Sequence, residues 1–275
     1  MNVLETLRAE LTISTARLLA TAAVLSDDDI AAPSRLPGWT RGHVLTHVAR
    51  NADSHVNLMT WARTGVVTPQ YPDPAARDAG IEAGAARPAK EQLADLEESA
   101  AGLAEAIEAV PAKGWTTLVG GIRSPGHPAW YVLVRRIREI GMHHVDLGAG
   151  YACADWPEVF VRRELHDVMV SWPHELSTVS EIVVEEVKEG DKHHQIWREL
   201  GSGPVVQGDA WTLLGWLTGR SPGTGLRVMP EGSHGERPTG ADAGPLPAPP
   251  PWMIRTAPPH LPITPPEEYP STTPS

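Results

Sequence analysis

Cysteine and phenylalanine are scarce in this sequence of 275 residues, and long apolar runs are absent. The single cysteine, Cys153, excludes an internal disulfide and any zinc cluster built from cysteines. Because no run of about 18 apolar residues occurs, we expect no membrane-spanning helix. One phenylalanine accompanies ten tryptophans and four tyrosines. Since packing alone would also draw on phenylalanine, some of the tryptophans are candidates for lining a pocket.

Basic residues are also fewer than acidic ones. Lysine and arginine number 23 against 34 acidic residues, for a net charge of -11, and no basic stripe offsets this balance. Nucleic acid is therefore excluded as a partner. The amphipathic N-terminal segment carries Glu5, Arg8, Glu10 and Arg17, unlike the uncharged apolar core of a signal peptide. We expect a cytoplasmic protein without a membrane partner.

Helical periodicity dominates the first half of the chain. Four segments carry it: residues 3–25, 40–64, 90–110 and 128–147. Thr40 is a plausible N-cap of the second segment, and Gly148 a plausible C-terminal cap of the fourth. The intervening stretches are rich in turn-forming residues and are predicted to be breaks or loops: 26–39, 65–80 and 111–128. Four helices of this length predict a four-helix bundle over residues 1–152.

The pattern changes after residue 152. A helix near 157–171 is followed by segments rich in β-branched residues, which predict strands. These are "SEIVVEEVKE", "HHQIWREL", "GPVVQGD" and "GLRVM", with helical spacing in "DAWTLLGWLTGR" between the last two. Residues 153–229 therefore predict a small α+β domain, and the chain as a whole an α+β fold.

From Pro230 onward the sequence holds 14 of its 27 prolines and few aliphatic residues. Such a segment has little apolar surface to offset the entropy of ordering. Residues 230–275 are predicted to be an extended tail, at best draped over the surface. Truncation after Met229 is expected to change the melting temperature by only a few degrees.

The stretch "REIGMHHVDLG", residues 138–148, concentrates groups that bind metals or move protons. Glu139 and His143 are four residues apart, so they share one face of the predicted helix. His144 points about 100° away from His143. Because two ligands rarely hold a metal, a third must come from another part of the chain.

The second predicted helix supplies candidates for that third ligand. His43, His47, Asn51 and His55 recur every four residues and form one polar stripe. Periodicity leaves the three histidines open, although flanking valines place His47 nearest the core. Two histidines and one carboxylate are the open, three-ligand set of a catalytic zinc site. Equally, each histidine could be a hydrogen-bonded packing residue.

Two motifs together, "SRLPGWTRGHVLTHVARNAD" and "RIREIGMHHVDLGAGY", resemble the mycothiol-dependent maleylpyruvate isomerase family, and "GDAWTLLGWLTGR" is similar to that family's C-terminal domain. The resemblance covers roughly residues 1–229. It implies a DinB-like bundle followed by a small module reminiscent of sterol carrier proteins. It also implies that His47, Glu139 and His143 hold the metal, and that Arg220 takes part in catalysis and cofactor binding.

The resemblance further implies zinc and mycothiol as cofactors and a small electrophilic molecule as substrate. A zinc-bound thiol loses its proton, and the thiolate can add to the cis double bond of maleylpyruvate. Rotation and elimination then leave fumarylpyruvate. A mycothiol S-transferase that omits the elimination, in detoxification or natural-product biosynthesis, is the main alternative. A second alternative is a DinB-fold hydrolase that uses zinc-bound water. A third is a binding module in which the metal is structural and held by a closed set of four ligands.

Several other side chains are candidates near the metal. Arg50 and Arg138 could pair with an anionic substrate, although we favour solvated surface positions for both. Asp146 lies one turn beyond His143 and could accept the second N–H of a ligating histidine, or be a surface charge.

Overall fold

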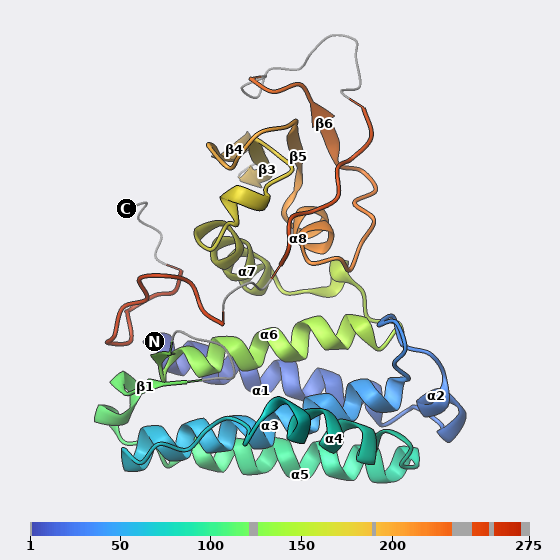
Figure 1. Ribbon diagram of the computed structural model, residues 1–275, viewed down its shortest axis with the longest axis vertical. Coiled ribbons are helices and arrows are strands. Elements are labelled where there is room, and N and C mark those ends of the chain that lie inside the picture. The colour runs from blue at the N-terminus through green and yellow to red at the C-terminus, as the bar shows by residue number, and fades with distance from the viewer. Residues whose placement is uncertain (1, 121–125, 189–190, 233–243, 253–255, 271–275) are drawn as a thin grey trace. The chain divides into compact units, whose positions relative to one another are not determined.

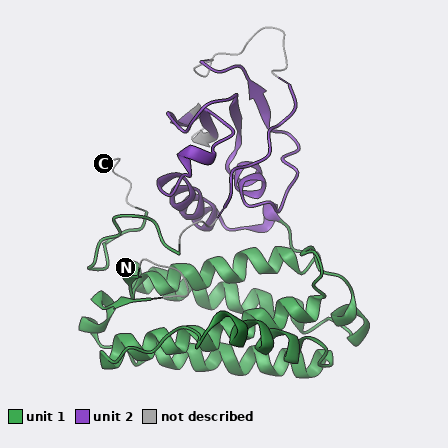
Figure 2. Cartoon of the chain, viewed as in Figure 1, with its two compact units in different colours: residues 1–152, 255–275 green, residues 153–254 purple. Residues whose placement is uncertain are grey.

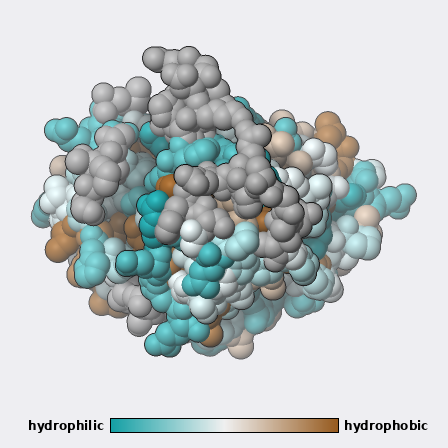
Figure 3. All heavy atoms as spheres, turned by 90° about the horizontal axis from the view of Figure 1, so that it is seen from above, coloured by the Kyte–Doolittle hydropathy of each residue, from teal (hydrophilic) through white to brown (hydrophobic). Residues whose placement is uncertain are grey.

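The computed structural model describes residues 2–120, 126–188, 191–232, 244–252 and 256–270. It divides into two compact units, Met1–Ala152 with Arg255–Ser275, and Cys153–Ile254 (Figure 2). None of the helices in these ranges is long and apolar enough to cross a membrane. On the face drawn in Figure 3, the described residues are mostly hydrophilic, and apolar ones gather only in small groups.

Four long helices form the body of the first unit (Figure 1). They are α1 (Val3–Ala22), α3 (Arg41–Thr64), α5 (Ala89–Glu108) and α6 (Tyr131–Asp146). Helices α3 and α6 pack on each other, α5 packs on α3, and α1 packs on α6 and α5. The predicted helical N-terminal region and the α+β fold class are thus confirmed. Helix α6 begins at Tyr131 rather than near Pro128, which lies in a short strand.

Local hydrogen bonds set where these helices begin and end. The Thr40 side chain accepts from the His43 backbone N–H, while the Thr40 N–H donates to the His43 ring, so α3 begins with a reciprocal cap. Gly65 ends α3 with a φ of 75°. Gly148 follows α6 with a φ of 64°, a left-handed conformation that glycine adopts without strain. The predicted roles of Thr40 and Gly148 are confirmed.

Two shorter helices occupy segments that were predicted to be breaks or loops. Helix α2 (Asp27–Ala31) begins with a capping box at Ser26, and α4 (Pro74–Ala85) begins with an Asp73 cap and a proline at its first position. The prediction of a loop over 65–80 is therefore wrong from residue 74 onward. Pro74 stands in the first turn of α4, where proline favours the helix because its backbone angle already suits it and no N–H is needed.

A glycine in α3 allows α4 to approach closely. A Cβ atom added at Gly42 would lie 2.0 Å from the Ala85 carbonyl oxygen at the end of α4. Any larger residue there would push the two helices apart. This contact holds α4 against the half of α3 that carries His47.

The second unit joins two helices to a four-stranded sheet. The helices are α7 (Glu158–Val170) and α8 (Ala210–Leu217); the strands are β3 (Glu181–Lys188), β4 (Asp191–Trp197), β5 (Val205–Asp209) and β6 (Arg227–Met229). The sheet order is β4-β3-β5-β6, with β3 and β5 parallel and the other pairs antiparallel. Each helix and strand predicted from the sequence is present.

Short elements complete the described chain: the 3-10 helices Ala112–Thr116, Cys153–Asp155 and His174–Leu176, and the strands β1 (Leu118–Val119) and β2 (His127–Pro128). Part of the loop predicted over 111–128 lies outside the described residues.

The proline-rich segment has no helix or strand among its described residues, 244–252 and 256–270. It is nevertheless packed. In the first unit the Tyr269 ring lies 5.2 Å from that of Trp130, and the Trp130 indole N–H donates to the Pro262 carbonyl at 2.9 Å. In the second unit the Trp216 indole donates to the Pro247 carbonyl. Tryptophan side chains thus hold the segment through its own backbone carbonyls.

Candidate metal centre

Three side chains of the first unit bring ligand atoms together where α3 faces α6. His47 comes from α3, and Glu139 and His143 come from successive turns of α6. The Nε2 atom of His47 lies 3.2 Å from Oε2 of Glu139 and 3.0 Å from Nε2 of His143. The third side of this triangle, from His143 Nε2 to Glu139 Oε2, is 3.4 Å. These residues form a candidate His-Glu-His metal site.

The spacing of the three atoms fits a small metal ion. An ion held tetrahedrally about 2.0–2.1 Å from nitrogen and oxygen ligands separates those ligands by about 3.3 Å. The observed separations of 3.0–3.4 Å therefore need almost no rearrangement. With three protein ligands, a tetrahedral ion would keep one position open. That is the pattern of a catalytic site rather than a structural one.

Asp146 contacts the other nitrogen of His143. Its Oδ2 atom lies 2.9 Å from His143 Nδ1, and the residue is only 2% exposed. The alternative of a surface charge is therefore wrong. A carboxylate at this place accepts the Nδ1–H and leaves Nε2 available for a ligand. The three-residue step along α6 brings the two groups together.

His47 is enclosed by Trp39 and by α4. The Trp39 ring centroid lies 5.6 Å from the imidazole, which is 5% exposed. On its other side Nη2 of Arg77 lies 3.3 Å from Nδ1 of His47. An arginine only donates, so in this structure Nδ1 accepts and Nε2 carries the hydrogen that faces Glu139.

Burial and mutual contact shift the acidities of the three groups. Burial lowers the pKa of His47 to about 4, and the neighbouring charge of His143 acts in the same direction. Burial opposes the charged forms of Glu139 and His143, but hydrogen bonds outweigh it. Contacts with both histidines hold the pKa of Glu139 well below its usual range, and Asp146 and Glu139 raise the pKa of His143. The cluster thus keeps an anionic carboxylate in a buried place, which suits a cation.

The other predicted histidines lie elsewhere. His43 turns toward the start of its own helix, where Thr40 Oγ1 lies 2.8 Å from Nδ1, and its Nε2 lies 3.5 Å from Glu82. His55 is fully buried and its Nδ1 donates to the Asn51 carbonyl. His144 stacks on Tyr151, with ring centroids 3.8 Å apart. None of these three belongs to the group of converging ligand atoms among the described residues.

The arginines considered from sequence have different surroundings. Arg138 is 5% exposed and donates to the Tyr131 hydroxyl, so the expected surface position is wrong. The face of α6 that carries Arg138 is buried, although a charged side chain usually indicates an exposed position. Arg50 is partly exposed and paired with Asp53 and Asp95. Arg220 lies in the second unit, where its guanidinium donates to the Thr218 carbonyl and stacks on the Trp252 ring at 4.8 Å.

Two other arginines near the site were missed by sequence reasoning. Arg135 precedes Glu139 by four residues and is held by His127 and Gln70. Extending the four-residue stripe backward from His143 and Glu139 would have found it. Arg77 was missed because its helix, α4, was predicted to be a loop.

The helical part of the chain matches a known protein family. Residues 11–148 match the mycothiol maleylpyruvate isomerase N-terminal domain family. The chain belongs to this family. The matched residues include His47, Glu139, His143 and Asp146, so the candidate metal site lies within the matched region.

Solved structures extend the likeness beyond that domain. The crystal structure of the mycothiol-dependent maleylpyruvate isomerase is 28% identical in sequence, with a TM-score of 0.76 over 90% of this chain and 97% of that one. A crystal structure of a mutant of mycothiol-dependent maleylpyruvate isomerase, with one histidine replaced by alanine, matches with a TM-score of 0.75 and the same identity and coverage. No curated protein matches the chain. The chain is thus homologous to an enzyme along most of its length.

Proposed function

We propose that this protein is a zinc- and mycothiol-dependent enzyme that isomerises maleylpyruvate to fumarylpyruvate. The observation that carries the proposal is the triangle of His47, Glu139 and His143 ligand atoms, with sides of 3.0–3.4 Å. It occurs in a chain that is similar to a mycothiol-dependent maleylpyruvate isomerase over 90% of its length. Zinc and mycothiol, when bound, would supply a metal-activated thiol for reversible addition to the cis double bond.

The protein's own groups prepare the site for that chemistry. Asp146 accepts from Nδ1 of His143 and keeps its Nε2 lone pair directed at the open centre. Glu139 supplies the one negative charge among the three ligands, so a divalent ion there keeps a net positive charge. Trp39 covers the His47 imidazole and limits the access of water. These features favour binding of a thiol in its ionised form.

Arg77 is proposed to bind an anionic group of the substrate. When Nε2 of His47 binds an ion, the ring proton must sit on Nδ1, which then no longer accepts from Arg77. The Arg77 side chain is 28% exposed, and its guanidinium also pairs with the exposed Asp78. It can therefore turn toward a carboxylate at the site, where an arginine fork pairs well.

Arg135 and Arg220 belong to the same proposal. Arg135 is on the stripe of Glu139 and His143, and its charge acts on that centre from one turn away. Arg220 is proposed to bind an anionic group of mycothiol or substrate, on the strength of the family motif that contains it. The Thr218 and Trp252 contacts fix its orientation.

The deciding experiment incubates purified zinc-loaded protein with maleylpyruvate, with and without mycothiol, and measures fumarylpyruvate by chromatography. We expect turnover only with mycothiol, and none with its S-methyl derivative. Accumulation of a stable mycothiol adduct would identify an S-transferase instead. Fumarylpyruvate formation without any thiol would contradict the proposal. Thiol-independent consumption of maleylpyruvate to hydrolysis products, with no fumarylpyruvate, would favour a hydrolase that uses metal-bound water.

A further inference from the structure

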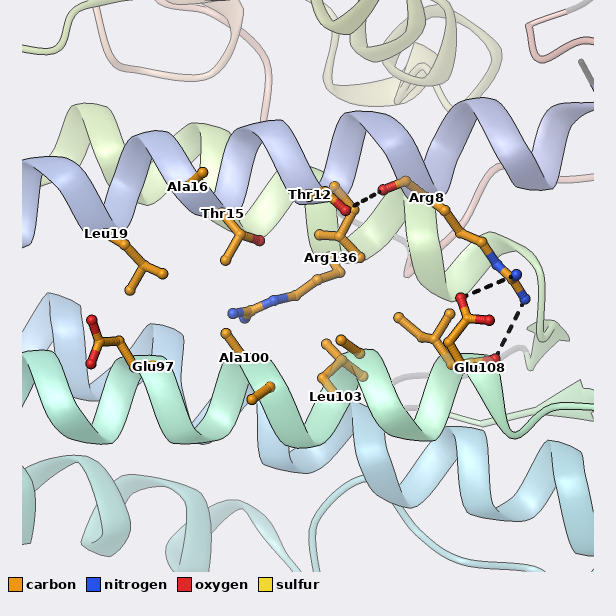
Figure 4. Close-up of a pocket in the computed structure, with 14 residues that line it drawn as sticks. Arg8, Thr12, Thr15, Ala16, Leu19, Glu97, Ala100, Leu103, Glu108 and Arg136 are labelled. Atoms are coloured by element: carbon orange, nitrogen blue, oxygen red, sulfur yellow. Dashed lines mark hydrogen bonds and ion pairs between the residues drawn. The ribbon is translucent and has the colours of Figure 1, made fainter.

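A cavity of about 400 Å³ lies within the first unit between α1 and α5 (Figure 4). Its volume is in the range of about 300–1,000 Å³ that is common for small-molecule sites. Bulky apolar side chains line it from both helices: Leu11 and Leu19 from α1, Leu103 and Ile107 from α5. Alanines such as Ala100 and Ala104 also line it, and their small side chains leave the space between the bulky ones unfilled.

A buried arginine reaches this cavity from a third helix. Arg136 comes from α6, is 3% exposed and extends its guanidinium between α1 and α5, as Figure 4 shows. Its Nη1 donates to the Val48 carbonyl at 2.8 Å and to Asn51 Oδ1 at 2.7 Å. Among the described residues, Nε and Nη2 of Arg136 have no hydrogen-bond acceptor. Two donors of a buried cation are thus left for something else.

Within the described part of the chain, the charge of Arg136 has no ion-pair partner either. Burial lowers its pKa to about 10, so it stays protonated at neutral pH, and Glu139 and Asp53 act on it only through space. The carboxylates that line the cavity, Glu97 and Glu108, belong to exposed residues, and Glu108 is paired with Arg8 at 3.3 Å. A buried cation without an ion pair is costly for a folded protein. An anion in the cavity would remove that cost.

We propose that the cavity between α1 and α5 binds a small molecule with one carboxylate and an apolar chain, of the medium-chain fatty acid class. The carboxylate would accept from Nε and Nη2 of Arg136, the paired geometry that a guanidinium offers. The chain would lie on Leu11, Leu19 and Leu103. This site is separate from the His47, Glu139 and His143 centre and does not depend on the proposed isomerase activity.

Calorimetric titration of the full-length protein with octanoate, and with 1-octanol as the uncharged match, tests the proposal. We expect one octanoate site per chain and at least about tenfold weaker binding of octanol, because a charge-assisted hydrogen-bond pair is lost. Ala100→Leu should fill the cavity and weaken octanoate binding by at least about tenfold. The control Ala20→Leu changes an exposed α1 residue that does not line the cavity, and should leave binding unchanged.

Further variants locate the anion. Arg136→Met should abolish the preference for octanoate over octanol; if it does not fold, the Ala100 and Ala20 pair still decides. His143→Ala should bind octanoate as the parent does, because it alters only the metal centre. The proposal is overturned by the absence of saturable binding, by equal affinity for octanol, or by loss of binding in His143→Ala. Self-association that Ala100→Leu abolishes would also overturn it, since a second copy would then occupy the groove.

Discussion

The Nδ1 atom of His143 lies 2.9 Å from Oδ2 of Asp146, and the carboxylate is almost fully buried. This contact distinguishes the environments of the two adjacent histidines, His143 and His144. His143 has one nitrogen held by Asp146 and the other facing His47 and Glu139, whereas His144 packs on Tyr151. The proposed metal site therefore includes Asp146, which supports a ligand, in addition to the three ligands themselves.

Asp146→Asn should weaken zinc binding by about 10–100-fold while the fold is kept. The amide has the shape of the carboxylate but no charge to stabilise the Nδ1–H of a ligating His143. Competition with a chromophoric chelator measures the affinity. Asp28→Asn, at an exposed position in α2, is the matched control and should bind zinc like the parent. Equal affinity in both variants would show that Asp146 does not support the ligand.

His47→Ala, Glu139→Ala and His143→Ala should each lose most of the bound zinc, because two remaining ligands rarely hold the ion. His43→Ala and His144→Ala should retain it, since those rings contact Thr40 and Tyr151 instead. Elemental analysis after exhaustive dialysis gives the metal content. A site emptied by His144→Ala but not by His143→Ala would mean that the wrong face of α6 carries the ligand.

Arg77→Met should raise KM for an anionic substrate by about 10–100-fold with a smaller effect on kcat, because it removes one charge-assisted contact made before and during the reaction. Arg50→Met is the control, since Arg50 is engaged by Asp53 and Asp95. Steady-state kinetics on both variants provide the comparison. An unchanged KM in Arg77→Met would remove this residue from the proposed substrate site.

His127 should make the protein sensitive to acid. Burial, together with the charge of Arg135, lowers the pKa of His127 from 6.5 to about 3. The unfolded chain therefore binds a proton between these values that the folded chain does not. The contribution of the neutral His127 to the free energy of unfolding is fully present above pH 6.5. It is lost as pH falls toward 3, by up to about 1.4 kcal/mol per pH unit.

The variant His127→Gln should consequently lose less stability than the parent between pH 6.5 and pH 4. Glutamine can still donate to the Pro128 carbonyl and accept from Arg135, as His127 does. Urea unfolding across that pH range measures the slope. Replacing the exposed His174 by glutamine should leave the slope as it is in the parent. Identical slopes in His127→Gln and the parent would contradict the assignment.

Deleting residues 256–275 should lower the melting temperature, against the expectation from composition. The deletion removes the Pro262 carbonyl from the buried Trp130 indole and the Tyr269 ring from its contact with Trp130. Tyr269→Ala alone should cost about 2–6 °C, at about 2–4 °C for each kcal/mol in a chain of this size. Glu267→Ala, at an exposed position, is the control. If scanning calorimetry shows no decrease in the melting temperature of the deletion variant, the tail does not stabilise the fold.

The repeat of apolar residues in the sequence was sufficient to predict the long helices of the first unit, but not the short helices α2 and α4. Helices α1, α3, α5 and α6 each run for more than four turns, with apolar positions that repeat every three or four residues, so their existence follows from local rules. Helix α4 is only 12 residues long and follows a stretch rich in proline, so local rules favour a loop there. It is held by the close approach at Gly42, a contact between segments that local rules do not describe.

The sequence by itself determined the stripe of Glu139 and His143, because a four-residue step on a helix always places two side chains on one face. It also indicated that a third ligand must come from another part of the chain, with the histidines of the second predicted helix as candidates. Periodicity left His43, His47 and His55 open, and only the family resemblance pointed to His47. The tertiary structure brings His47 to Glu139 and His143, since the rotation of α3 depends on packing against α4, α5 and α6. The same packing buried Arg136 beside the cavity between α1 and α5. Contacts between helices that are distant in sequence set these outcomes, and no local pattern encodes them.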